Sequence, residues 1–135
     1  MSSVDSEADR ERERNRATVR RFFELPICDE RRALYAEDGV KEMATHGMRW
    51  TGQEALRRGD EYNLQFDSGW HHKEPTIWAT EDPKVFWVEV DGEGARSFGG
   101  CDPLPVGGPY VFRITLDNGK IKLLREWSVK PTPPQ

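Results

Sequence analysis

The sequence predicts one α+β domain in which helices cover one face of an antiparallel sheet. Segments with the spacing of amphipathic helices lie in the N-terminal half, and segments rich in β-branched and aromatic residues lie in the C-terminal half. The turn residues Asp117-Asn118-Gly119 join two of the latter segments as a β-hairpin. At 135 residues the chain is long enough to bury one core, and its five Trp and six Phe favour a folded chain over a disordered one.

Three helices are predicted in the first half of the chain. The first spans residues 8–25, which contain no Gly or Pro and are followed by a proline. Its apolar side chains share one face: Val19, Phe22 and Phe23. A second helix begins at Asp29, whose carboxylate can cap the first turn, and ends by Gly39. The third opens at Thr51 and ends at residues 67–69, and three of its side chains are expected to face the core: Leu56, Tyr62 and Phe66.

Strands are predicted at residues 74–78, 85–90, 110–116 and 120–129. Residues 40–50 are ambiguous and fit two short strands with Gly47 at a turn between them. Residues 91–100 fit either a twisted strand end with bulges or a loop. Residues 101–109 contain three prolines and two glycines and are predicted to be a loop.

Composition and charge exclude several classes of protein. The net charge of −4 argues against a nucleic-acid partner, because phosphate binding needs a concentrated basic surface. No apolar run approaches the ~18–20 residues that a membrane span requires, so no membrane partner is expected. Cys28 and Cys101 are isolated, which predicts free thiols in a cytoplasmic protein. We expect a polar tail at 1–8, one domain at 9–130 and a second tail at 131–135.

Several short stretches, in order along the chain, resemble those of a known family. They are Asn15–Val19, Arg31–Gly39, Gly52 with Leu56, Trp70, Asp82–Gly94, Leu116–Lys122 and Arg125–Trp127. With these residues the chain resembles the phenazine-biosynthesis A/B family, a branch of the SnoaL-like, nuclear-transport-factor-like superfamily. The resemblance implies a cone-shaped, cystatin-like α+β barrel, in which a curved antiparallel sheet carries three N-terminal helices on its concave face and encloses a pocket. It also implies a homodimer that needs no cofactor and binds a small cyclic or aromatic carboxylate.

The resemblance implies that Glu126 is an acid/base group, because it matches the family's glutamate on the last strand. From strand periodicity alone its direction stays open. A two-residue turn would pair Glu126 with Val111 and a three-residue turn with Tyr110, and a one-residue slip exchanges the two faces of a sheet. The family's histidine of the third helix falls at Gly59. His72 or the adjacent His71 could supply an imidazole instead, or both could lie at an exposed strand end.

Other candidates would bind substrate or form part of the core. Arg32 could bind a carboxylate in bidentate fashion or be a solvated helix charge. A set of aromatic side chains could line a pocket for a flat ring or pack in the core: Tyr35, Tyr62, Phe66, Trp70, Trp87 and Tyr110. No metal site is expected, because His46 is the one other histidine and zinc-type spacings are missing.

These observations favour a cofactor-free acid/base enzyme that condenses, isomerises or cyclises a small cyclic keto acid in aromatic secondary metabolism. Two alternatives remain. One is a non-catalytic binding protein of the same fold, and the other is a SnoaL-like cyclase or dehydratase that acts on a polyketide or terpenoid.

Overall fold

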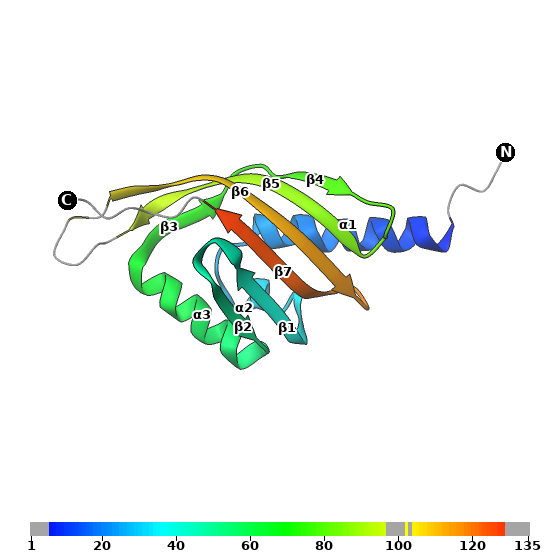
Figure 1. Cartoon of the computed structure of the whole chain (residues 1–135), viewed down its shortest axis with the longest axis horizontal. Helices are drawn as coiled ribbons and strands as arrows, with labels where there is room; N and C mark the ends of the chain where they lie inside the picture. Colours follow the sequence, from blue (N-terminus) through cyan, green and yellow to red (C-terminus); the bar gives the residue numbers. More distant parts are fainter. Residues whose placement is uncertain (1–5, 97–101, 103, 129–135) are drawn as a thin grey trace.

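The computed structural model describes residues 6–96, 102 and 104–128 and shows a curled seven-stranded sheet with helices on its concave side (Figure 1). The elements are α1 (Glu7–Glu24), α2 (Asp29–Arg32), β1 (Tyr35–Met43), η1 (Ala44–His46), β2 (Met48–Thr51), α3 (Gln53–Phe66), β3 (Asp67–His72), β4 (Thr76–Ala79), β5 (Val85–Arg96), β6 (Leu104–Asp117) and β7 (Lys120–Ser128). The strand order is β2-β1-β7-β6-β5-β3, and β4 also pairs with β5. The predicted α+β class is confirmed. The expected tails lie largely outside the described residues.

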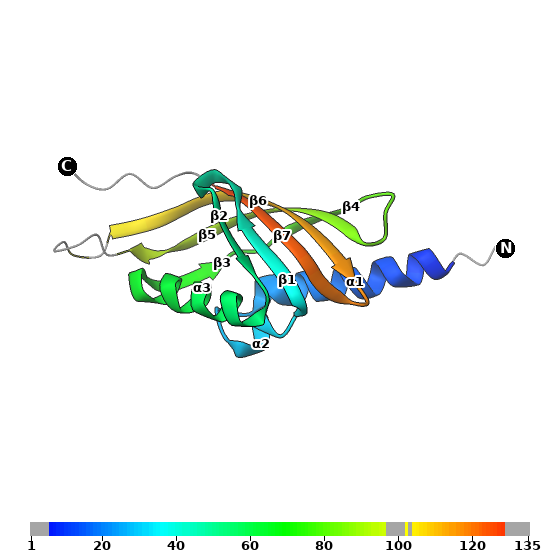
Figure 2. The ribbon, with the colours of Figure 1, turned by 60° about the horizontal axis from the view of Figure 1, so that its bottom comes forward.

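The sheet is mixed, whereas an antiparallel sheet was predicted. β1 runs parallel to β7 and antiparallel to β2, and the remaining pairs are antiparallel. The helices also do not precede all strands, because β1 and β2 lie between α2 and α3. Figure 2 shows α1 and α3 on the same side of the curved sheet.

The first predicted helix is confirmed as α1. Ser6 caps it by accepting a hydrogen bond from the Asp9 backbone N–H at 3.1 Å. Its apolar stripe is buried against the sheet: Val19, Phe22 and Phe23. The buried Asn15 donates a hydrogen bond to the Pro83 carbonyl at 3.0 Å, which ties the helix to the turn between β4 and β5.

The second predicted helix is much shorter than expected. α2 has a single turn, and the chain from Tyr35 onward is strand β1. Gly39 lies within β1 and does not end a helix. It lets the β1 backbone lie close to β7, because a Cβ there would be 2.9 Å from the carbonyl oxygens of Ala36 and Ile121. Pairing with β7 therefore prevails over the local helix propensity of this segment.

The predicted loop at 101–109 is also wrong where the structure describes it. β6 begins at Leu104 and pairs with β5 from Leu104 to Thr115. Gly107 permits this pairing, because a Cβ there would lie 2.2 Å from the Gly92 carbonyl oxygen. The ambiguous segment after Val90 is strand as far as Arg96.

A bulge in the predicted hairpin decides which way Glu126 points. Asp117 pairs with Lys120 across a two-residue turn, but the register shifts between Thr115 and Leu116. Glu126 consequently lies opposite Phe112, not opposite Val111 or Tyr110. Phe112 belongs to the core on the concave face, so Glu126 points inward.

Candidate functional site

The concave face carries a buried carboxylate. Glu126 is 8% exposed and follows Leu124 on the same face of β7. Within the described part of the chain, no residue donates a hydrogen bond to the Glu126 carboxylate or forms an ion pair with it. A buried carboxylate without a partner is costly to the fold, and such groups therefore mark candidate functional sites.

A buried arginine lies within electrostatic reach of this carboxylate. Arg31 of α2 is 8% exposed, and its guanidinium carbon lies 4.2 Å from the centroid of the Phe22 ring. Burial lowers its pKa, while the charges of Tyr35, Asp60 and Glu126 oppose that effect. Arginine nevertheless stays cationic in proteins. The Arg31 side chain has no hydrogen bond or ion pair with the residues described, so its donors are free for an anion.

His72 supplies a neutral imidazole on the same face. Its ring makes edge contacts with Phe23 at 5.0 Å and with Phe112 at 5.9 Å. Burial lowers the pKa of His72 to about 3, and the charges of Arg31, Lys41 and His71 add to this effect. The ring is therefore neutral near pH 7 and is a weak base, so it acts there as a neutral polar group.

Tyr35 of β1 completes the buried polar groups on this side of the sheet. Its ring lies edge-on to Phe22 at 5.8 Å. Burial raises the pKa of the Tyr35 phenol, and so the hydroxyl is a neutral donor at physiological pH.

Among the predicted candidates, Trp70 and Tyr110 also lie on the concave face. Their rings are 5.5 Å apart, and the Trp70 indole covers Gly92, where a Cβ would lie 2.5 Å from its Cζ2 atom. His71 points the other way: its ring contacts the Glu93 carboxylate at 2.9 Å. The imidazole of the concave face is therefore His72.

Other candidates lie away from this cluster. Arg32 is paired with Asp29 and, at 3.1 Å, with Asp60, so its donors are already engaged. Tyr62 was expected to face the core but is 50% exposed. Trp87 lies on the convex face and stacks on Trp127. The Phe66 side chain lies outside the described residues.

Sequence reasoning missed Arg31 and Lys41. Arg31 and Arg32 are neighbours in a four-residue helix, which is too short for periodicity to show which of them points inward. Lys41 falls in the segment whose secondary structure was ambiguous. A prediction that 40–43 form a strand beside 121–126 would have placed it opposite Leu124.

A polar hollow of about 700 Å³ lies elsewhere on the sheet. It is lined by His71, Lys73, Asp91, Gly92, Glu93, Gly94, Pro105, Gly107 and Gly108. Three of its polar groups contact one another, since the Glu93 carboxylate lies 2.9 Å from His71 and 3.3 Å from Lys73. The concave cluster is the better candidate because, in the described part of the chain, the side chains of Arg31 and Glu126 have no such ion-pair partners.

The described ranges hold neither a metal-binding cluster nor a membrane-spanning helix. No group of three or more His, Cys, Asp or Glu side chains is placed to hold a metal ion there. None of the helices described is long and apolar enough to cross a membrane.

Comparison with known proteins identifies the family. The sequence model of the phenazine biosynthesis protein A/B family matches residues 4–131. The chain belongs to this family. It is 34% identical to phenazine biosynthesis protein PhzA2 of Pseudomonas aeruginosa over 122 residues, which cover 86% of this chain and 75% of that protein. It is 31% identical to PhzB1 of the same organism over 131 residues, 90% of this chain and 79% of the relative.

Solved structures agree with this assignment. The crystal structure of the phenazine biosynthesis-related protein PhzB2 of P. aeruginosa superposes with a TM-score of 0.82 at 29% identity and covers 90% of this chain and 82% of that one. A candidate polyketide cyclase from Xanthomonas campestris has a TM-score of 0.78 at 16% identity, with 88% and 93% covered. This second likeness shows that the two proteins share a fold.

Gly59, where the resemblance places a family histidine, has no room for a side chain. A Cβ there would lie 2.9 Å from Nε1 and 3.0 Å from Cε2 of Trp50. The indole of β2 therefore occupies the space beside this turn of α3. In this member of the phenazine A/B family, any second proton-transfer group must come from another position.

Proposed function

We propose that this chain is a cofactor-free acid/base enzyme that condenses, isomerises or cyclises a small cyclic keto acid in aromatic secondary metabolism. The observation that carries the proposal is the pair of buried charges on one face, Glu126 and Arg31, whose side chains form no ion pair with any residue described and which lie beside the neutral His72. Its relatives named as phenazine biosynthesis proteins support the same kind of chemistry.

The roles follow from the chemistry of each group. Arg31 binds the substrate carboxylate, because a desolvated guanidinium forms strong charge-assisted hydrogen bonds with planar anions. The Glu126 carboxylate takes the proton from an amine nitrogen as a C–N bond forms at the ketone carbon, and passes it to the oxygen of that carbon, which becomes a hydroxyl while Glu126 returns to the carboxylate. Water then leaves that carbon. The neutral His72 and Trp70 would line the site beside the substrate rings and exclude bulk water from it.

An Arg31→Met variant is expected to raise KM about 10–100-fold, because a hydrogen bond to a charged group contributes about 1.5–3 kcal/mol. Methionine fills much of the same volume and keeps the contact with Phe22. KM should be measured beside that of Arg21→Met, which removes a half-exposed arginine of α1. Equal KM values for the two variants would contradict the anchoring role.

In phenazine assembly, which the family resemblance implies, the ketone and amine groups of two aminocyclohexenone carboxylates condense to a tricyclic product. The function is tested by an anaerobic assay with freshly generated aminocyclohexenone carboxylate and mass spectrometry of that product. Wild-type protein should accelerate product formation over the protein-free reaction. Thermal stabilisation by the substrate without any product would favour a binding protein. If the substrate is neither converted faster nor stabilises the protein, the result would favour a SnoaL-like cyclase with an unrelated substrate.

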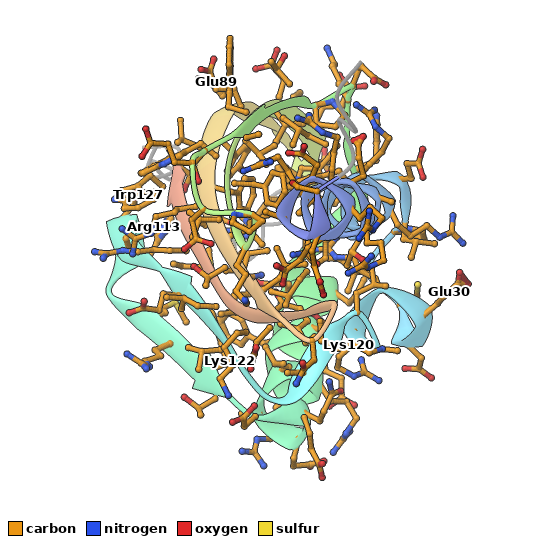
Figure 3. The ribbon with its side chains drawn as sticks, turned by 90° about the vertical axis from the view of Figure 1, so that its right-hand side faces the viewer. Glu30, Glu89, Arg113, Lys120, Lys122 and Trp127 are labelled. Atoms are coloured by element: carbon orange, nitrogen blue, oxygen red, sulfur yellow. The ribbon has the colours of Figure 1, made fainter. Side chains whose placement is uncertain are left out.

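We also propose that two copies associate through the convex face of the sheet. Trp78 and Trp87 are 54% and 38% exposed there, and the Arg113 guanidinium lies 5.9 Å from the Trp87 ring centroid. Figure 3 shows Trp127, Arg113 and Glu89 pointing away from the helices. An apolar patch of this kind favours association.

The charges on this face suit a second copy. Glu89 and Arg113 form no ion pair with any residue described, although they lie on neighbouring strands of the same face. In a two-fold interface, residue i of one copy meets residue j of the other, and j meets i. Glu89 of one copy can therefore pair with Arg113 of the other copy, and Arg113 of the first with Glu89 of the second.

Charge reversal tests this association. Glu89→Arg and Arg113→Glu are each expected to raise the dimer dissociation constant at least about tenfold, because like charges then face one another. The double variant should restore it, since both pairs are regenerated with opposite sign. Light scattering after size exclusion gives the mass, and a monomeric wild-type chain at about 100 µM would refute the interface.

A further inference from the structure

A third charged group, Lys41, lies on the face that holds Glu126. Lys41 pairs with Leu124 of β7 on one side and with Trp50 of β2 on the other. Leu124 is fully buried on the concave face, and paired residues of neighbouring strands point the same way. Met43, two residues further along β1, lies opposite Glu126. Lys41 and Glu126 are therefore diagonal neighbours on the concave face.

Trp50 holds the Lys41 side chain in place. The Nζ atom lies 5.7 Å from the centroid of the indole, within the range of a cation–π contact. The Trp50 indole also packs against α3, where Gly59 has no side chain and so leaves room for the ring. The ammonium is thereby kept on the side of the sheet that faces the site.

The charge of Lys41 acts on the site directly. Together with burial and the charge of Arg31, it lowers the pKa of His72. The imidazole is therefore a poor proton donor near pH 7, whereas an ammonium group is a competent one. Among the described groups of the cluster, the Glu126 carboxylate can accept a proton and the Lys41 ammonium can release one, whereas burial raises the pKa of the Tyr35 phenol so that it keeps its proton.

The geometry points to Lys41 as the general acid of this site, which donates its proton to the departing water. This inference rests on the proposed function. In the carbinolamine formed from ketone and amine, the C–O bond breaks and the hydroxyl leaves as water with the Lys41 proton. The nitrogen passes its own proton to the Glu126 carboxylate as the C=N bond forms. Proton transfer from Glu126 to the Lys41 amine restores both groups.

Two replacements separate proton donation from charge. Lys41→Arg keeps the positive charge and the contact with Trp50, but a guanidinium does not release its proton near pH 7. Lys41→Met removes both. Both variants are expected to lower kcat at least about 100-fold, and Lys41→Arg should leave KM within about twofold. Lys122→Met, which removes a half-exposed lysine of the adjacent strand β7, is the matched control.

NMR titration of His72 gives a second readout. The His72 pKa should stay low in Lys41→Arg and rise in Lys41→Met, because only the latter loses the neighbouring charge. A merely structural role for Lys41 would not produce this split. Melting temperatures of all variants confirm that the fold is kept.

The outcomes are distinct. Wild-type turnover in Lys41→Arg would overturn the proton-donor role and leave Lys41 as a fixed charge. Fast Lys41 variants beside an inactive Glu126→Gln variant would overturn this inference but not the proposed function. A wild-type chain that does not accelerate product formation from aminocyclohexenone carboxylate would overturn both.

Discussion

A Glu126→Gln variant is expected to fold like the wild-type chain and to turn over substrate about 10²–10⁴-fold more slowly. Glutamine has nearly the same shape but cannot accept the amine proton. The carboxylate has no hydrogen-bonded partner among the described residues, so the substitution leaves no protein donor unsatisfied there. KM should stay constant or fall, because Arg31 then faces one fewer competing anion.

The control for this experiment is Glu37→Gln, at an exposed position of β1. Steady-state kinetics should show wild-type kcat for the control, and denaturant unfolding should show similar midpoints for both variants. If Glu126→Gln kept full turnover with an intact fold, the acid/base assignment would be wrong.

The second large effect concerns the strand pair β5–β6. Gly107→Ala is expected to destabilise the fold by about 2–4 kcal/mol, because it combines a steric clash with backbone strain. A Cβ at this position would lie 2.2 Å from the Gly92 carbonyl oxygen, and the φ angle is +147°. The backbone of β5 would have to move, and Trp70 packs on Gly92 at this point.

Gly108→Ala separates the two causes. Gly108 also has a positive φ, +130°, but a Cβ there would have no atom within 4 Å. It should cost only the conformational strain, about 1–2 kcal/mol. Urea unfolding measures both variants. Equal losses for the two would show that the close approach of Gly107 to β5 does not matter for stability.

Local signals made part of the fold predictable. The Gly- and Pro-free run of α1 and the Asn118-Gly119 turn depend on neighbouring residues alone, and both were predicted. The N-terminal half of β6 was missed because its prolines indicated a loop. Pro105 and Pro109 are tolerated because, in the described part of the chain, β7 pairs with β6 only from Tyr110 onward.

The site was less predictable because it depends on long-range geometry. The family resemblance was enough to identify Glu126 as a candidate. Its inward direction, however, is set by a bulge near Leu116 that no sequence pattern predicted. From the sequence, Arg32 could be either an anion anchor or a solvated helix charge, whereas the structure buries Arg31, whose side chain has no ion pair among the residues described. Lys41 joins the site only through the pairing of β1 with β7.

The parallel pairing of β1 with β7 has a consequence for how the molecule reaches its native state. Val40 meets Leu123, so the centre of the sheet joins positions that are far apart along the chain. Closing so long a loop costs entropy before any contact repays it, and folding slows as such contacts increase. The segment that carries Glu126 must therefore be synthesised before β1 and β7 can pair at the centre of the sheet. Catalytic activity should consequently appear only in the final stage of folding.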